Sequence, residues 1–315
     1  MDPQVQALLQ MMEAQSAATG APPMYELPAD VARQGAEVGF QAFNNGMPDI
    51  GSIVDRTIPG PAGQIPVKVF TPTGSGPFPL LVFLHGGGWV IGSPNTHAKL
   101  CAELAQGAGA VVLSVGYRLA PEHPAPAPLD DCVAAIRWAA EHGSEIGAAG
   151  GRFAVGGDSA GGNLSAAAAL RLRDEGGPVP GFLLLLYGAF TGDLDLPSVI
   201  ENGEGKILTR KSMEWFYEQY LSGGASVMDP YIAPINADLR GMPPTHLIVG
   251  TLDPLLDDSK LFAEKLEQAG VPARLSIYQD MPHIFMQLSG MLDGGKKGVA
   301  EASEALRGAL TPLPA

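Results

Sequence analysis

Short apolar runs recur along the chain from residue 80 onward, and longer stretches of helical periodicity lie between them. The apolar runs span residues 80–84, 111–115, 153–155, 182–186, 246–249 and 274–278. The helical stretches span residues 99–106, 129–142, 163–174, 259–269 and 297–310. Nearly continuous apolar strands are typical of a sheet that helices cover on both faces. The alternation therefore predicts an α/β fold with a mostly parallel central sheet flanked by helices, and residues 53–71 are predicted to form an antiparallel hairpin at its edge.

Two segments interrupt this alternation. Residues 1–45 begin with an amphipathic helix whose apolar face holds Val5, Leu8, Leu9 and Met12. Residues 190–230 contain a second stripe at positions i, i+3, i+4 and i+7, formed by Met213, Phe216, Tyr217 and Tyr220. Both stripes are explained by packing on the core, and also by a helical cap that packs over the active site. The cap interpretation divides the chain into a cap segment 1–45, a core part 46–189, a cap insertion 190–230 and a second core part 231–315.

Composition and charge narrow the classes of partner. The 315 residues are 46% hydrophobic, which is enough for a large core, and the formal net charge is −14. Such a charge disfavours nucleic acid and anionic membranes as partners. No apolar run is long enough to span a bilayer, and no basic residue or long apolar run precedes Arg33, so we expect neither membrane insertion nor a secretory signal. We expect a cytoplasmic protein in which Cys101 and Cys132 are buried free thiols.

A G-x-S-x-G pattern spans Gly157 to Gly161, directly after the apolar run 153–155 and before a helical stretch. Between a strand and a helix this pattern holds a serine on a tight turn with its hydroxyl exposed at the sheet edge. Glycine-rich turns of this kind also cradle phosphates, but no Gly-Lys-Ser/Thr or G-x-G-x-x-G follows here. We interpret Ser159 as a nucleophile for acyl transfer.

A base and an orienting acid should follow later strands at the same edge of the sheet. His283 follows the last strand, on a loop before the final helix. The other histidines start a strand, lie near the end of a helix or lie in other connections, except His85, which ends a strand but belongs to a glycine cluster. Asp253 ends the strand before it, and Asp257 is the alternative acid, although Asp257 and Asp258 lie at a helix start, where acids act as caps and dipole partners. The predicted triad is Ser159, Asp253 and His283, in the chain order of an α/β-hydrolase.

A second glycine-rich loop, His85-Gly86-Gly87-Gly88-Trp89, follows the strand 80–84. Consecutive glycines let the backbone approach a substrate and direct several N–H groups at one point. In esterases an H-G-G-G loop of this type supplies part of the oxyanion hole, and the N–H of the residue after the nucleophile supplies the rest, here Ala160. The sequence thus predicts an oxyanion site beside Ser159.

These motifs together resemble the hormone-sensitive-lipase-like esterases of the α/β-hydrolase superfamily. The resemblance covers about residues 65 to 310 and rests on five blocks, namely residues 85–89, Tyr117-Arg118-Leu119-Ala120-Pro121-Glu122, residues 157–163, Asp253-Pro254-Leu255 and His283-Ile284-Phe285. It implies a split helical cap, oxyanion donors at Gly87, Gly88 and Ala160, a shaping role for His85 and an anchoring role for Glu122, and it is compatible with a homodimer. The chain departs from the family pattern at Leu256 and Ile284, which affects only the pocket wall.

The expected function is hydrolysis of short- to medium-chain carboxylic esters through an acyl-enzyme, without a cofactor or metal. The expected partner is an uncharged small-molecule ester, contacted by Trp89, Met213, Phe216 and Ile284. The same triad also serves amidases and lactonases, so the bond cleaved stays open at this point. A non-catalytic ligand-binding protein on the same fold is the other alternative, and the presence of all three triad residues argues against it.

Overall fold

A single mixed sheet runs through the molecule, whose computed structural model describes residues 1–311. Its eight strands lie in the order β1-β2-β4-β3-β5-β6-β7-β8. The first two, β1 and β2, form the predicted antiparallel hairpin, β2 pairs antiparallel with β4, and every later pair is parallel. The strands are β1 (Ser52–Gly60), β2 (Gly63–Thr71), β3 (Phe78–Leu84), β4 (Val111–Val115), β5 (Ala148–Asp158), β6 (Phe182–Leu186), β7 (Thr245–Leu252) and β8 (Ala273–Pro282). The predicted α/β class with a mostly parallel sheet is confirmed.

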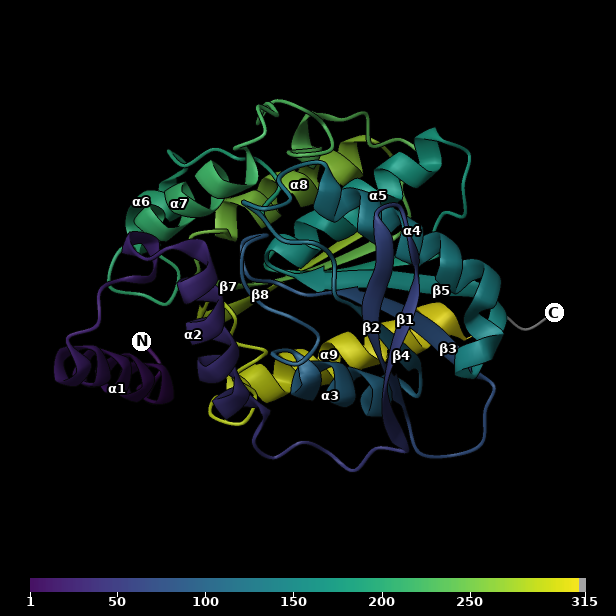
Figure 1. Cartoon of the computed structure of the whole chain (residues 1–315), viewed down its shortest axis with the longest axis horizontal. Coiled ribbons are helices and arrows are strands. Elements are labelled where there is room, and N and C mark those ends of the chain that lie inside the picture. Colours follow the sequence, from purple (N-terminus) through teal and green to yellow (C-terminus); the bar gives the residue numbers. More distant parts are fainter. Residues whose placement is uncertain (312–315) are drawn as a thin grey trace.

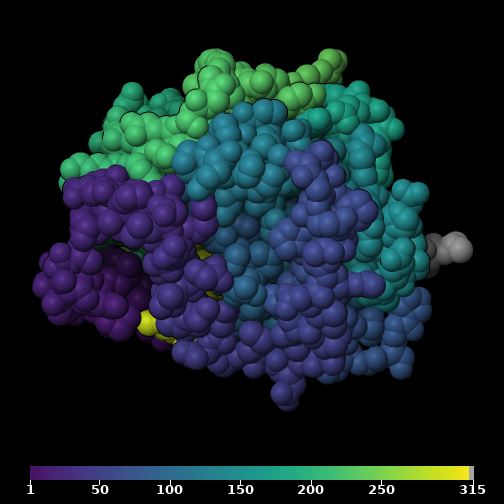
Figure 2. All heavy atoms as spheres, viewed as in Figure 1, coloured from purple at the N-terminus to yellow at the C-terminus, as the bar shows by residue number. Residues whose placement is uncertain are grey.

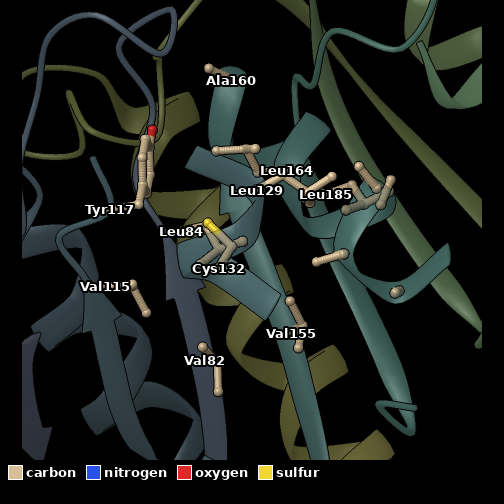
Figure 3. Packing of buried hydrophobic residues seen from close by; sticks show 14 of the residues in the cluster. Val82, Leu84, Val115, Tyr117, Leu129, Cys132, Val155, Ala160, Leu164 and Leu185 are labelled. Carbon is tan, nitrogen blue, oxygen red and sulfur yellow. The ribbon is translucent and has the colours of Figure 1, made fainter. Parts of the chain in front are cut away.

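Helices cover both faces of this sheet, as Figure 1 shows. Helices α3 (Ala98–Ala108) and α9 (Asp293–Leu310) pack side by side on one face. On the other face lie α4 (Ala127–His142), α5 (Ala160–Asp174) and α8 (Leu256–Gln268). Two hydrophobic clusters result, one on each side of the sheet. Figure 3 shows part of the cluster beneath α4 and α5, where Val82, Leu84 and Val155 of the strands face the same interior as Leu129 and Leu164 of the helices.

Several strands are longer than their apolar runs predict, and the extensions of β5 and β8 concern the site. Strand β5 begins at Ala148 and, after its apolar run, continues through Gly156 and Gly157 to Asp158, the residue before Ser159. Strand β8 continues to Pro282, because the β7–β8 pairing shifts register after Gly250 and then resumes with Leu252 opposite Pro282. His283 therefore follows a strand directly rather than lying within a loop. The carboxyl ends of β3, β5, β7 and β8 all meet at one edge of the sheet.

The two segments outside the alternation lie together at this edge. Helices α1 (Pro3–Thr19) and α2 (Ala29–Gln41) come from the N-terminal segment, and α6 (Pro197–Asn202) and α7 (Arg210–Tyr220) come from the insertion. In Figure 2 the purple N-terminal segment and the green chain after residue 190 adjoin at one end of the molecule, and Lys211 of the insertion stands over the Tyr25 ring of the N-terminal segment. The boundaries at residues 45, 190 and 230 stay a prediction.

The predicted apolar stripe on the first helix is only half correct. Val5 and Leu8 are buried, but Met12 is 39% exposed. The reason is that only the first turns of α1 dock on the core, where Gln4 accepts a hydrogen bond from the backbone of Asp293, while the rest of the helix extends into solvent. None of the helices within residues 1–311 has the length and apolar character needed to cross a membrane.

Candidate active site

Ser159 lies on the tight turn between β5 and α5. Its backbone has φ 53° and ψ −120°, which a residue with a side chain rarely adopts. The turn fits because its neighbours lack side chains: a Cβ at Gly161 would overlap the carbonyl oxygen of Leu84 at the end of β3. The backbone N–H of Ser159 donates to the carbonyl of Leu186 at 2.8 Å, which ties the turn to β6. This strained geometry presents the Ser159 hydroxyl above the edge of the sheet.

The structure brings the three predicted triad side chains into one hydrogen-bonded chain. The Oγ of Ser159 lies 2.9 Å from Nε2 of His283, and Nδ1 of His283 lies 2.7 Å from Oδ2 of Asp253. Asp253 is fully buried, and its other oxygen accepts a hydrogen bond from the N–H of Leu255 at 2.8 Å. The ring of Tyr187 meets the imidazole of His283 edge to face at 5.0 Å. A hydroxyl, an imidazole and a carboxylate in this order can move a proton away from the serine.

The glycine loop after β3 passes beside this chain. Gly87 and Gly88 have φ values of +117° and +57°, and a Cβ at Gly88 would overlap the ring of Phe216. Ala160 is the first residue of α5, so its N–H has no acceptor within the helix. The arrangement therefore offers backbone donors from two elements near Ser159. Within residues 1–311, no three His, Cys, Asp or Glu side chains are grouped so as to hold a metal ion.

A buried pair behind the glycine loop was missed at the sequence level. Asp158 accepts a hydrogen bond from the N–H of Gly86 at 2.8 Å, and Nε2 of His97 lies 3.2 Å from the same carboxylate oxygen. Asp158 and His97 are both less than 4% exposed. The residue before Ser159 thus fastens the loop that contains Gly87 and Gly88. The only sequence signal was the aspartate inside the G-D-S-A-G pattern, because His97 lies in an irregular connection.

His85 is placed as a structural residue, in agreement with the role that the family resemblance implies. Its ring stacks on Tyr117 at 4.2 Å, and the Tyr117 hydroxyl donates to the His85 carbonyl at 2.6 Å. Burial, together with the charge of neighbouring His97, lowers the pKa of His85 to about 3. The imidazole is therefore neutral at ordinary pH and shapes the loop through its packing.

Helix α2 is fastened to the same region by Arg33. Its guanidinium donates to the carbonyls of Val90 and Ala120 and forms an ion pair with Glu122 at 2.8 Å. Val90 lies two residues after Gly88, so the N-terminal segment is anchored directly to the glycine loop. The Glu122 position that the resemblance singles out thus contacts α2, although its side chain is half exposed.

Two unequal cavities meet at Ser159. The larger has a volume of about 340 Å³ and extends beneath α2 and α7, with Ile284 and His283 in its wall. The smaller has a volume of about 30 Å³, room for about two water molecules, and is lined by Trp89 and Met213. Both cavities share a boundary formed by Gly88, Ser159, Leu208 and Phe216. The four predicted substrate contacts are therefore divided, with Ile284 in the large cavity, Trp89 and Met213 in the small one, and Phe216 in both.

The two acids at the start of α8 do not cap that helix as the sequence suggests. In the described part of the chain, residues 1–311, no side chain caps α8. Asp257 instead accepts a hydrogen bond from the N–H of Ser198, and Asp258 accepts from the N–H groups of Phe190 and Thr191. The loop after β6 and the insertion bring these N–H donors close to the start of α8. The periodicity of a single segment cannot predict such a contact between distant segments. Neither carboxylate contacts His283, so Asp253 alone of the two candidate acids holds the imidazole.

Asp258 makes folding stability depend on pH. Burial raises the pKa of its carboxyl to about 6, because the loss of hydration outweighs three hydrogen bonds. The folded state therefore binds more protons than the unfolded chain between the two pKa values, and stability falls as the pH rises through this window. The Asp258→Asn variant keeps an acceptor oxygen and cannot ionise. Relative to wild type it should gain about 2 kcal/mol of unfolding free energy between about pH 4 and about pH 8.

Urea unfolding of both proteins at the two pH values measures this gain. Asp257→Asn is the matched control, because the hydrogen bonds of Lys260 and Ser198 hold the pKa of Asp257 below its usual value despite partial burial, so its trend should have the opposite sign. If the unfolding free energies of Asp258→Asn and wild type differ by the same amount at both pH values, ionisation of the Asp258 carboxylate does not destabilise the folded state.

Comparison with known proteins gives the family. The alpha/beta hydrolase fold family matches residues 81–287. The carboxylic ester hydrolase LipN of Mycobacterium tuberculosis is 43% identical over 266 residues, 82% of this chain and 71% of that protein. The ethyl acetate hydrolase of Pseudomonas putida is 33% identical over 313 residues, 98% of each chain. The solved hyperthermophilic esterase of the archaeon Pyrobaculum calidifontis superposes with a TM-score of 0.92 at 34% identity, covering 98% of each chain. The chain belongs to the alpha/beta hydrolase fold family, among its hormone-sensitive-lipase-like carboxylic ester hydrolases.

Proposed function

We propose that this ester hydrolase works through an acyl-enzyme formed on Ser159. His283 Nε2 takes the hydroxyl proton as Ser159 Oγ attacks the ester carbonyl carbon, and Asp253 stabilises the imidazolium. The N–H groups of Gly87, Gly88 and Ala160 hold the oxyanion. His283 then gives its proton to the leaving alcohol oxygen, and a water molecule repeats the attack to release the acid. The observation that carries this proposal is the 2.9 Å and 2.7 Å chain from Ser159 through His283 to Asp253.

The two cavities support an assignment of the two halves of the ester. His283 must reach the leaving oxygen, and it lines the large cavity but not the small one. The alcohol half therefore occupies the 340 Å³ cavity, and the acyl half occupies the 30 Å³ cavity beside Ala160. A volume of this size accepts an acetyl or propionyl group. We propose that the substrates are short-chain acyl esters of larger apolar alcohols.

Residues of the small cavity set the acyl length in this proposal. Met213 lines the small cavity and is absent from the wall of the large one. Met213→Ala should therefore move the optimum of kcat/KM toward longer acyl chains, with a gain of about fourfold for each further methylene that becomes buried, about 0.8 kcal/mol. A series of p-nitrophenyl esters from acetate to octanoate measures the optimum for wild type and variant.

The matched control is Ile207→Ala, which enlarges only the large cavity and should leave the acyl optimum in place. Met213 is 5% exposed, so the conservative variant Met213→Val serves if the alanine variant unfolds. A wild-type optimum at octanoate, or an optimum that moves with Ile207→Ala instead of Met213→Ala, would reverse the assignment of the two cavities.

We also propose a location and an assembly for this protein. The cytoplasm is the proposed location. A homodimer is the proposed assembly, and it is supported by the position of β8 at the end of the sheet, where Ile277 is 45% exposed and the outer edge of the strand is free of a partner strand within residues 1–311.

A further inference from the structure

A buried chain of polar side chains runs behind the glycine loop and ends on its backbone. The hydroxyl of Thr96 lies 2.8 Å from Nδ1 of His97, and Nε2 of His97 lies 3.2 Å from Oδ1 of Asp158. The same carboxylate oxygen accepts a hydrogen bond from the N–H of Gly86 at 2.8 Å. All three side chains are less than 4% exposed. The proposed mechanism uses none of them.

The peptide groups of the glycine loop take their direction from the contacts of their carbonyls. In a trans peptide the N–H points away from the carbonyl of the preceding residue. The N–H of Gly87 shares its peptide with the carbonyl of Gly86, which accepts a hydrogen bond from Nδ1 of His85 at 2.8 Å. The N–H of Gly88 shares its peptide with the carbonyl of Gly87, which accepts from the N–H of Ile91 at 2.9 Å. Both proposed oxyanion donors are therefore oriented by contacts on the opposite side of the loop.

Asp158 fixes the point at which this run of peptides begins. Its carboxylate binds the N–H of Gly86, and a Cβ at Gly86 would lie 2.5 Å from Oδ2 of Asp158, so the carboxylate packs directly against the backbone. Rotation of the Gly86 backbone would break this hydrogen bond and turn the peptides that follow. The direction of the Gly87 N–H therefore depends on the place of the Asp158 carboxylate.

His97 holds the carboxylate in that place. An ionised carboxylate only accepts hydrogen bonds, and among residues 1–311 the donors to the Asp158 side chain are the Gly86 N–H and Nε2 of His97. The Gly86 nitrogen also lies 3.3 Å from Nε2 of His97, so the three groups form one tight cluster. Without the His97 donor a buried charge would keep a single partner, which is costly. The carboxylate would then move or take up a proton, and its bond to Gly86 would weaken in either case.

We infer that His97 is a positioning residue for the oxyanion site, which it affects through Asp158 and Gly86. The inference rests on the proposed function, in which the N–H groups of Gly87 and Gly88 hold the oxyanion. These N–H groups stabilise negative charge that develops on the substrate oxygen during the reaction. Loss of the His97 donor should therefore weaken binding of the charged oxygen and leave binding of a neutral carbonyl compound almost unchanged.

Two ketones of the same length test this inference. With 1,1,1-trifluorooctan-2-one, the Ser159 oxygen bonds to the carbonyl carbon, the hydroxyl proton passes to His283, and the ketone oxygen becomes an oxyanion. Octan-2-one binds without this addition. His97→Leu should lower kcat for p-nitrophenyl acetate by about 10- to 100-fold, less than the full loss of one oxyanion donor. The inhibition constant of the trifluoromethyl ketone should rise by the same factor, and that of octan-2-one should change by less than about twofold.

A conservative variant and a double-mutant cycle separate positioning from packing. His97→Gln keeps a side-chain N–H donor and should stay within about threefold of the wild-type kcat. Asp158→Asn removes the charge that His97 pairs with, so in that background His97→Leu should cost less than about threefold more. His246→Leu is the matched control, because His246 is equally buried but lies at the opposite edge of the sheet, where it is hydrogen-bonded to Ser276 at 2.9 Å. This control should keep the wild-type kcat and both inhibition constants.

An equal weakening of both ketones by His97→Leu would overturn the inference, because it would assign His97 a role in the cavity wall only. A wild-type kcat in the folded variant, or additive losses in the double-mutant cycle, would also overturn it. His97→Asn, whose amide is too short to reach Asp158, provides the same test if the leucine variant does not fold. A wild type that the trifluoromethyl ketone inhibits no better than octan-2-one would instead contradict the proposed function.

Discussion

Replacing Ser159 with alanine should lower kcat for ester hydrolysis by about 10⁴- to 10⁶-fold. Among residues 1–311 the side chain of Ser159 makes a single hydrogen bond, to His283, and the backbone bond from its N–H to Leu186 does not depend on the hydroxyl. Alanine removes the nucleophile while the strained turn, the glycine loop and both cavities stay in place. Any residual rate would come from direct attack of water on an ester that the cavities bind and the proposed oxyanion donors polarise. Initial rates with p-nitrophenyl acetate, after exhaustive removal of wild-type contamination, measure the loss.

Ser222→Ala is the matched control for this loss. Ser222 lies on the exposed surface after α7, and its hydroxyl contacts only the carbonyl of Gln219 among residues 1–311. This variant should hydrolyse the ester at the wild-type rate. Binding of a non-hydrolysed substrate analogue by Ser159→Ala, together with an unchanged melting temperature, would show that the site is intact. Ester hydrolysis that survives undiminished in a folded Ser159→Ala protein would exclude Ser159 as the nucleophile.

Most of the fold was predictable because the strands carry their own signature. Runs such as residues 80–84 and 182–186 are apolar on both faces, and this composition is stable only in a sheet covered by helices on both sides. Strand ends were less predictable. The last four residues of β8, Gln279 to Pro282, extend the strand only because β7 resumes its ladder after a shift in register, with Leu252 opposite Pro282, a property of two strands together.

The G-x-S-x-G pattern marked Ser159 locally, but the contact of Ser159 with His283 and of His283 with Asp253 followed from topology. Parallel strands end at one edge of the sheet, so residues that follow β5, β7 and β8 are brought together whatever their separation in the chain. The sequence separations of 124 positions from Ser159 to His283 and 30 positions from Asp253 to His283 are therefore no obstacle to their contact. The roles assigned to them stay predictions that the variants test.

Features that depend on side-chain packing across distant segments were beyond the sequence. Asp158 pairs with His97 across 61 residues, and no periodicity relates the two positions. Trp89 and Met213 lie in the small cavity only because the Phe216 ring stands against Gly88 and forms the boundary. The choice between ester and amide bonds was also open, and the relatives named as ester hydrolases favour the ester.

Asp253→Asn should lower kcat by about 10⁴-fold. It should reduce the free energy of unfolding less than most other substitutions at buried positions do. The amide can keep the bond from the Leu255 N–H through its oxygen, and its NH₂ group would then face Nδ1 of His283. An amide donor at this place favours the imidazole tautomer with the proton on Nε2, the nitrogen that must accept the proton of Ser159. The nucleophile, the base and the oxyanion donors all remain, but the base carries its proton on the wrong atom.

The Asp257→Asn variant separates this effect from a general loss of negative charge near the site. Asp257 lies four residues along the chain from Asp253, and its carboxylate contacts Ser198 and Lys260 rather than His283. Its replacement should leave kcat close to that of wild type. A larger loss for Asp257→Asn than for Asp253→Asn would make Asp257 the orienting acid and require a different arrangement in the working enzyme. Similar small losses for both would mean that His283 finds its tautomer without a carboxylate, since both variants keep the nucleophile and the cavity walls. The proposed role of Asp253 therefore depends on a difference between two neighbouring aspartates, which identical assays of the two variants measure directly.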